Sequence, residues 1–316
     1  MPDSHALALL FRSRWWRLTQ IFLSAGLIAW VLSGLGTDAL LEVRRLSPGR
    51  LVLALVLFSL SQVFGGVRLW LLLRRQGSTI GCSTVMRLTW IGLFASNFLP
   101  STIGGDVAKG ALLIRSGLRG KVTIAALVMD RLVNMATMVG LTVGCVVAGR
   151  LGMLLIGGHA GVPPEGLGFA ILFPWPLARL RRTGRSIGTT YLRGLVREYV
   201  GIARQWLNWP TGLALAVLLS GASVMSAVLG QFLLLRDLGI ALELLEFTAI
   251  SGLVYLITLV PVSLNGIGVR EAGLVFLLVA LGADRDAATV LAVLARLLMV
   301  ATSIPGGFAM ISLRTE

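Results

Sequence analysis

The chain has 316 residues, of which 56% are hydrophobic and 13% charged, and its mean hydropathy is +0.87. A water-soluble globule of this length cannot bury so much apolar surface, so the composition predicts a polytopic membrane protein. The net charge is +14, and the basic residues lie in short runs between apolar segments. This pattern indicates topology signals and contacts with membrane lipids, and it does not favour nucleic-acid binding.

The first half of the chain begins with two predicted spans. Leu18 to Gly36 follows three arginines, so we expect a retained helix whose N-terminus is cytoplasmic. Leu51 to Leu73 crosses back and is stopped in the cytoplasm by Arg74 and Arg75. These two segments therefore bring the chain back to the side on which it started.

The next stretch, Cys82 to Leu99, meets Pro100 and then Gly104-Gly105, and the chain is basic again soon afterwards. A segment with basic flanks on both sides favours a re-entrant hairpin over a span. Val122 to Gly149 is long enough to cross outward. Leu151 to Trp175 would then return the chain to residues 176–208, the most basic stretch, which we place in the cytoplasm.

The second half shows the same succession with the opposite orientation. Thr211 to Leu235 crosses outward, and Leu244 to Pro261 enters from outside. A second break, Pro261 to Gly268, turns the chain back through Val269 to Leu281. Ala287 to Ile311 then crosses inward, so the C-terminus is expected in the cytoplasm.

The predicted fold is therefore all-α, with about six spanning helices and two re-entrant broken-helix hairpins. A single integral membrane domain covers residues 1–316; residues 51–149 form the first repeat, 150–210 a connecting span and basic segment, and 211–312 an inverted second repeat. Hairpins that enter from opposite faces are typical of the inverted-topology repeats of transporters. The alternative is that Pro and Gly are simply common in membrane helices.

Charged residues lie deep in two predicted spans. Asp130, Arg131 and Arg296 each lie about nine residues into a helix, or ~14 Å deep, where a charge costs about 2.5–3.5 kcal/mol. We expect them to face the bundle interior, and neighbours such as Asp130 and Arg131 must find separate partners. One interpretation is a structural ion pair between the repeats, for example Arg131 with Glu271 or Arg296 with Asp106. The other is that the arginines hold an anionic group, because a guanidinium binds phosphate bidentately.

The two breaks supply further candidate groups. A broken helix exposes unpaired N–H groups, and glycines there allow close approach of a ligand, although tight helix packing explains them equally well. Arg68 lies near the cytoplasmic end of its span and could snorkel. The candidate substrate-binding residues are Arg131, Arg296, Arg270, Lys109, Asn97 and Asn265; the candidate gating or proton-coupling acids are Asp106, Asp130 and Glu271; and the glycines are Gly104, Gly105, Gly266 and Gly268.

Four motifs resemble one known family. They are Asn97 to Asp106, Asp130-Arg131-Leu132, Pro261 to Glu271 and Arg68-Leu69-Trp70, and together they are similar to the flippase-like family named for the transmembrane region of lysylphosphatidylglycerol synthase. The resemblance implies movement of a lipid between leaflets, whereas aminoacyl transfer belongs to a soluble domain that we expect this chain to lack. Lys109 stands where the family more often has Arg, which keeps the charge without the bidentate fork.

We therefore expect a flippase or transporter of an anionic phospholipid or polyprenyl-phosphate-type lipid in the inner cell membrane, with the oligomeric state, homo-oligomer included, left open. We expect no enzymatic activity, no metal and no cofactor: Cys82 and Cys145 are isolated, and no G-x-x-x-x-G-K-[ST] occurs. The alternatives are a membrane glycosyltransferase acting on a lipid-linked substrate through Asp38 and Glu42, and a non-transporting assembly factor whose arginines would tolerate Gln.

Overall fold

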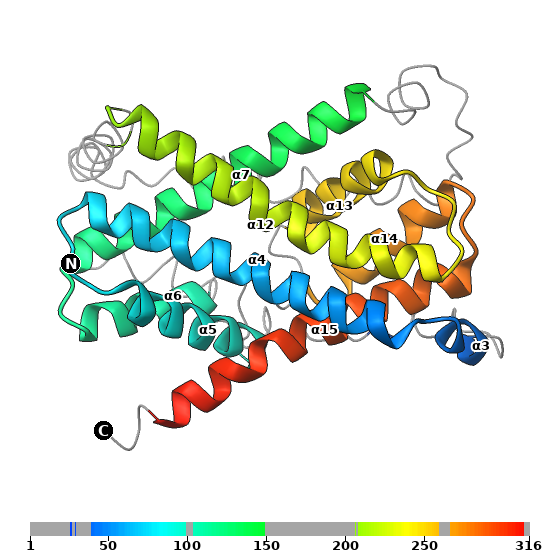
Figure 1. The fold of residues 1–316 in the computed structure, drawn as a ribbon, viewed down its shortest axis with the longest axis horizontal. Coiled ribbons are helices and arrows are strands. Elements are labelled where there is room, and N and C mark those ends of the chain that lie inside the picture. The colour runs from blue at the N-terminus through cyan, green and yellow to red at the C-terminus, as the bar shows by residue number, and fades with distance from the viewer. Residues whose placement is uncertain are drawn as a thin grey trace, which may run out of the picture.

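A computed structural model of the chain describes residues 26, 29, 39–98, 104–148, 206, 208–258 and 266–312 (Figure 1). These residues form helices joined by turns, with no strand among them. Within these ranges, four helices are long and apolar enough to cross a membrane: α4 (Pro48–Arg75), α7 (Gly120–Ala148), α12 (Pro210–Asp237) and α15 (Arg285–Ser312). The prediction of an all-helical membrane protein is confirmed.

Several of the sequence predictions lie outside the described residues. The spans predicted at 18–36 and 151–175 do so apart from positions 26 and 29, and the basic segment 176–208 does so apart from positions 206 and 208. Asn265 also lies outside them. Of the six predicted spans, the structure therefore describes four, which are the four long helices.

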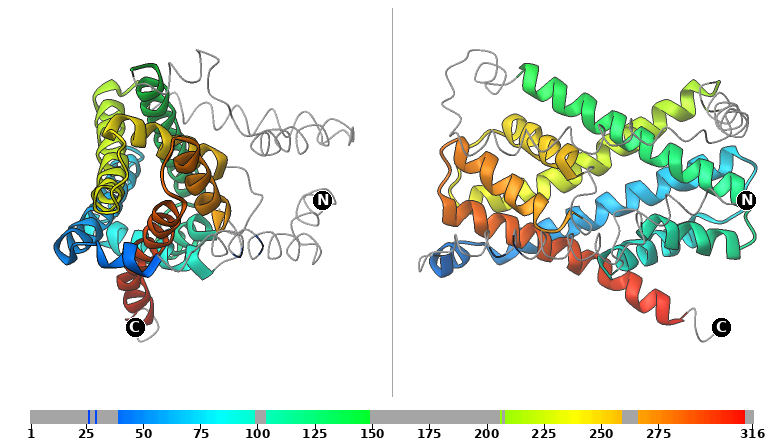
Figure 2. Two further views of the ribbon diagram at one scale, coloured as in Figure 1. Left: turned by 90° about the vertical axis from the view of Figure 1, so that its right-hand side faces the viewer. Right: turned by 180° about the vertical axis from the view of Figure 1, so that it is seen from behind.

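The helices α4 and α12 lie side by side along much of their length (Figures 1 and 2). Each has 28 residues and a proline in its first turn, where the missing N–H would have no helical partner. At ~1.5 Å per residue each is ~42 Å long, which exceeds the ~30 Å hydrocarbon core and allows a tilted crossing. The hydroxyl oxygens of Ser61 and Ser223 approach to 3.1 Å between the two helices.

Two pairs of shorter helices, the broken pairs, each lie on either side of one predicted break, of which residues 99–103 and 259–265 lie outside the described ranges. The first pair is α5 (Cys82–Phe98) and α6 (Gly104–Arg115), and the second is α13 (Leu244–Thr258) and α14 (Val269–Ala280). A short helix, α3 (Ala39–Arg44), precedes α4. In Figure 1 the α5–α6 pair lies toward the end of the molecule where α4 ends, and the α13–α14 pair toward the end where α4 begins. The two pairs thus approach the middle from opposite ends.

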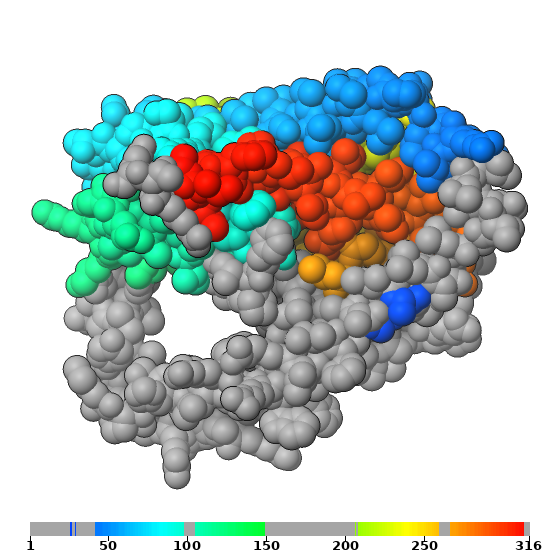
Figure 3. All heavy atoms as spheres, turned by 90° about the horizontal axis from the view of Figure 1, so that it is seen from below, coloured from blue at the N-terminus to red at the C-terminus, as the bar shows by residue number. Residues whose placement is uncertain are grey.

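Each pair packs against the long helix of the other half of the chain. Helix α5 contacts α15, and α13 contacts α7. A Cβ on Gly306 would lie 2.0 Å from the Trp90 carbonyl oxygen, and one on Gly252 would lie 1.8 Å from Thr142 Oγ1. Figure 3 shows the face on which α15 also runs beside α4. Glycines therefore permit close helix contacts at both crossings.

Gly306→Ala is expected to destabilise the protein by about 1–3 kcal/mol, because the new methyl group meets backbone and not a movable side chain. Gly221→Ala is the matched control, since no atom lies within 4 Å of the place that its new methyl group would occupy, and alanine favours a helix interior by about 0.5–1 kcal/mol. Thermal unfolding in detergent measures both. Equal melting temperatures for Gly306→Ala and the wild type would contradict the close contact between α15 and α5.

Buried apolar side chains form two clusters that leave a polar zone between them. One cluster includes Phe58 of α4 with residues of α12, α13, α14 and α15, and the other includes Leu69 of α4 with residues of α5, α6 and α7. Between these two positions α4 carries Ser61, Gln62 and Arg68. The core is therefore interrupted near the middle of the long helices.

Candidate functional site

A cavity of about 280 Å³ occupies this polar zone. On α4 it is lined by Ser61, Gly65 and Arg68, which share one helix face by their spacing. The other walls come from α12 and α7 and from all four short helices of the broken pairs, with α15 contributing Met299. Among its described lining residues, the charged ones are Arg68, Lys109, Asp130 and Arg270.

Arg68 and Asp130 form the most buried charged contact of the cavity wall. The Arg68 side chain is 6% exposed, and its Nε donates to Asp130 Oδ1 at 2.7 Å. Its Nη1 donates to Asn134 Oδ1 at 2.9 Å and to Ser220 Oγ at 2.6 Å. The suggestion that Arg68 could snorkel to the membrane surface is wrong, because these partners hold it inside the bundle. Asp130 and Asn134 share a helix face, as their spacing predicts.

Asp106 pairs with two cations of its own half. It is the third residue of α6, and it accepts a short hydrogen bond from Arg131 Nε of α7. Lys109 Nζ lies 3.4 Å from its other oxygen, and Lys109 also lines the cavity. The Arg131 side chain is 43% exposed and is not part of the cavity lining, which differs from the expected interior position. The suggested pair between Arg131 and Glu271 is therefore wrong.

Glu271 holds the corresponding position in the second half. It is the third residue of α14, and Arg296 Nε of α15 donates to its Oε1 at 2.6 Å. Its Oε2 accepts the Gly268 N–H at 2.7 Å. The suggested pair between Arg296 and Asp106 is wrong as well. In both halves the arginine follows its acid by 25 residues, so the same local spacing produces both ion pairs.

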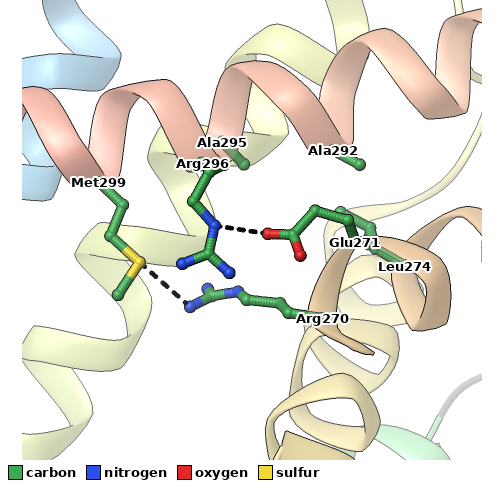
Figure 4. Close-up of a pocket in the computed structure, with 7 residues that line it drawn as sticks. All are labelled: Arg270, Glu271, Leu274, Ala292, Ala295, Arg296 and Met299. Atoms are coloured by element: carbon green, nitrogen blue, oxygen red, sulfur yellow. Dashed lines mark hydrogen bonds and ion pairs between the residues drawn. The ribbon is translucent and has the colours of Figure 1, made fainter. Parts of the chain in front are cut away.

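Arg270 and Arg296 lie close together beside this one carboxylate (Figure 4). Within the described ranges, no carboxylate oxygen lies within 4 Å of the Arg270 guanidinium, and its Nη1 contacts Met299 Sδ at 3.6 Å. Arg296 Nη2 is buried and has no hydrogen-bond partner among the described residues. A pocket of about 10 Å³ beside them holds about one water at most. Among the described residues, both arginines therefore keep donors without a partner.

The other candidates divide between the cavity and the helix packing. Asn97 donates to Ser303 Oγ at 2.8 Å and joins α5 to α15 outside the cavity lining. Gly105 packs against α5, because a Cβ there would lie 2.7 Å from the Gly92 carbonyl oxygen. Gly266 and Gly268 have φ of 70° and 83°, which favours glycine at the turn into α14. Gly104 begins α6.

Arg68 was not predicted from the sequence as the partner of Asp130. No local signal identifies this pair, because its members lie 62 residues apart. The pairs of Asp106 and Glu271 did have a signal, namely the equal spacing of 25 residues to an arginine in the following long helix. In the described part of the chain, no group of three or more His, Cys, Asp or Glu side chains could hold a metal ion.

Comparison with known proteins gives one match. A family model described as the lysylphosphatidylglycerol synthase TM region matches residues 17–306. This range contains α4, α7, α12 and α15 up to Gly306, both broken pairs and every residue that lines the cavity. No curated protein and no solved structure matched the chain.

Proposed function

Because the chain belongs to the lysylphosphatidylglycerol synthase transmembrane-region family, we propose that it moves an anionic lipid between the leaflets of a membrane. The cavity is the observation that carries this proposal. Arg68, Lys109 and Arg270 line this cavity of about 280 Å³. The long helices that form its walls are long enough to cross a membrane. Charged groups at this depth are costly and mark substrate or ion pathways in membrane proteins.

The two halves are proposed to form an inverted-topology repeat. Both second helices of the pairs have 12 residues, both acids occupy the third position, and both arginines follow 25 residues later. Each pair packs on the long helix of the other half, as a two-fold relation requires. We propose that α5–α6 enters from the cytoplasmic side, which Arg74 and Arg75 mark, and that α13–α14 enters from the other side.

In this mechanism the headgroup occupies the cavity while the acyl or prenyl tails remain in the bilayer. Lys109 and Arg270 bind the anionic group, and the Arg68–Asp130 pair joins α4 to α7 in the cavity wall. Rocking of one half against the other would expose the cavity to each leaflet in turn. The sequence has no nucleotide-binding G-x-x-x-x-G-K-[ST], so we propose downhill or ion-coupled movement, in which Asp106, Asp130 and Glu271 are the available carboxylates.

The topology predicts which positions a membrane-impermeant thiol reagent reaches. In a protein with Cys82 and Cys145 replaced, Ser116→Cys follows α6 and should react only from the cytoplasmic side, whereas Ala280→Cys ends α14 and should react only from the other side. Both side chains are exposed. Reaction of both from the same side would contradict the inverted arrangement.

Transport is tested with the purified protein in liposomes that contain a headgroup-labelled anionic lipid. The expected result is that the labelled headgroup becomes accessible from outside faster than in protein-free liposomes. An assembly factor would leave the rate unchanged, and this outcome would overturn the proposal. A glycosyltransferase would instead consume a lipid-linked substrate. Of the two acids proposed for such an enzyme, Glu42 is 9% exposed and pairs with Arg45 at 2.7 Å. Asp38 lies outside the described residues.

A further inference from the structure

The charges that line the cavity do not balance. Within the described residues, Arg68, Lys109 and Arg270 contribute three positive charges and Asp130 contributes one negative charge. The groups directly behind the wall leave this difference unchanged, because two arginines there are matched by two carboxylates, in the pairs Arg131–Asp106 and Arg296–Glu271. Either way of counting leaves an excess of two positive charges.

The excess belongs to two particular side chains. Arg68 is matched by Asp130 at 2.7 Å, so its charge is compensated inside the wall. Lys109 and Arg131 share the one carboxylate of Asp106, and of these two cations it is Lys109 that lines the cavity. Arg270 contacts a thioether sulfur. Among the described residues, Lys109 and Arg270 are therefore the cavity-lining cations that have no carboxylate to themselves.

These two cations come from the two different broken pairs. Arg270 is the second residue of α14, at the positive end of that helix dipole, and Lys109 lies in the second turn of α6. Both line the same cavity, together with neutral polar side chains such as Gln231 and Tyr255. A ligand in this space meets two charges and several hydroxyl and amide groups at once. Such a lining matches a compact group with two negative charges and several acceptor oxygens.

We propose, on the basis of the function proposed above, that the transported headgroup is a phosphate monoester that binds as the dianion, as at the end of a polyprenyl phosphate. A phosphodiester such as the headgroup link of phosphatidylglycerol carries one negative charge and would leave one buried cation uncompensated. A monoester with two charges neutralises both Lys109 and Arg270. The cavity therefore selects the monoester over the diester.

The ionisation of the ligand makes this selection measurable. A phosphate monoester loses its second proton with a pKa near ~6, whereas a phosphodiester stays singly charged across the neutral range. If only the dianion binds, affinity is constant well above pH ~6 and falls toward tenfold per pH unit below it. The ionisable groups facing the ligand are Arg68, Lys109, Asp130, Tyr255 and Arg270, and a diester lipid experiences the same groups. A pH effect confined to the monoester therefore comes from the ligand.

The experiment measures equilibrium binding of polyprenyl phosphate and of phosphatidylglycerol to the full-length protein in one detergent between about pH 5 and pH 8. The expected result is at least about tenfold tighter binding of polyprenyl phosphate at the upper end of this range, and loss of this preference toward the lower end. Arg270→Gln should remove most of the preference. Arg115→Gln, an exposed arginine at the end of α6, should retain it.

Each other outcome has a defined meaning. Equal binding of both lipids at the upper pH, or an equal pH dependence for both, overturns the monoester proposal while lipid transport stands. Binding of neither lipid overturns the proposed function together with it. Inorganic phosphate is the third ligand: competition as strong as that of polyprenyl phosphate would identify a soluble phosphate compound as the ligand and would contradict a lipid monoester.

Discussion

Replacing Arg68 with Gln should destabilise the protein by about 3–5 kcal/mol, the largest stability effect that we expect from one substitution. The Asp130 side chain is 13% exposed and pairs with the Arg68 guanidinium at 2.7 Å. Without that cation its carboxylate stays buried without a counter-charge. Asn134 and Ser220 lose their donor as well. Thermal or chemical unfolding in detergent measures the change.

A double variant separates the ion pair from other effects of the substitution. Arg68→Gln with Asp130→Asn removes both charges, so it should be more stable than Arg68→Gln alone. Arg74→Gln is the control on the same helix, since Arg74 is exposed and its guanidinium lies over Trp70; its effect should stay below about 1 kcal/mol. A double variant less stable than the single one would contradict a buried pair between α4 and α7.

Replacing Arg270 with Gln should reduce lipid transport at least about tenfold without lowering the unfolding free energy below that of the wild type. No carboxylate lies within 4 Å of the Arg270 guanidinium among the described residues, so its removal strands no partner there. A charge-assisted hydrogen bond to a ligand is worth about 1.5–3 kcal/mol, which corresponds to a tenfold or larger change in binding. The liposome assay and thermal unfolding are run on the same preparations.

Two other arginines show whether this effect is specific to the cavity. Arg115→Gln should transport at the wild-type rate, because Arg115 is exposed at the end of α6. Arg296→Gln should be destabilised, because it leaves Glu271, whose side chain is 8% exposed, without its cation. Normal transport by Arg270→Gln would remove Arg270 from the binding site.

The helices were largely predictable from the sequence because long apolar runs end at charged or glycine-rich residues. The stretch predicted at 122–149 is α7 at Gly120–Ala148, and that predicted at 211–235 is α12 at Pro210–Asp237. The second break was predictable in the same way, because α14 directly follows Gly268, whereas residues 99–103 of the first break lie outside the described ranges. Local chemistry determines each of these bounds.

The partners of the charged residues were not predictable in this way. That Asp130 and Arg131 need separate partners follows from helix geometry and is confirmed, since Asp130 pairs with Arg68 and Arg131 with Asp106. Which cation reaches which acid depends on how α4, α6 and α7 are positioned against one another. The sequence pattern alone therefore identified Lys109, Asp130 and Arg270 as candidates but did not exclude Arg131 from the cavity wall.

The central claim is that the lipid headgroup passes through the cavity, and blocking the cavity tests it most directly. Ala227→Cys, in a protein without the native cysteines, places a thiol on the α12 wall, and Ser116→Cys outside the cavity is the control. After complete modification with a negatively charged thiol reagent, transport by Ala227→Cys should stop, and transport by Ser116→Cys should continue. Undiminished transport by fully modified Ala227→Cys would contradict a pathway through this cavity.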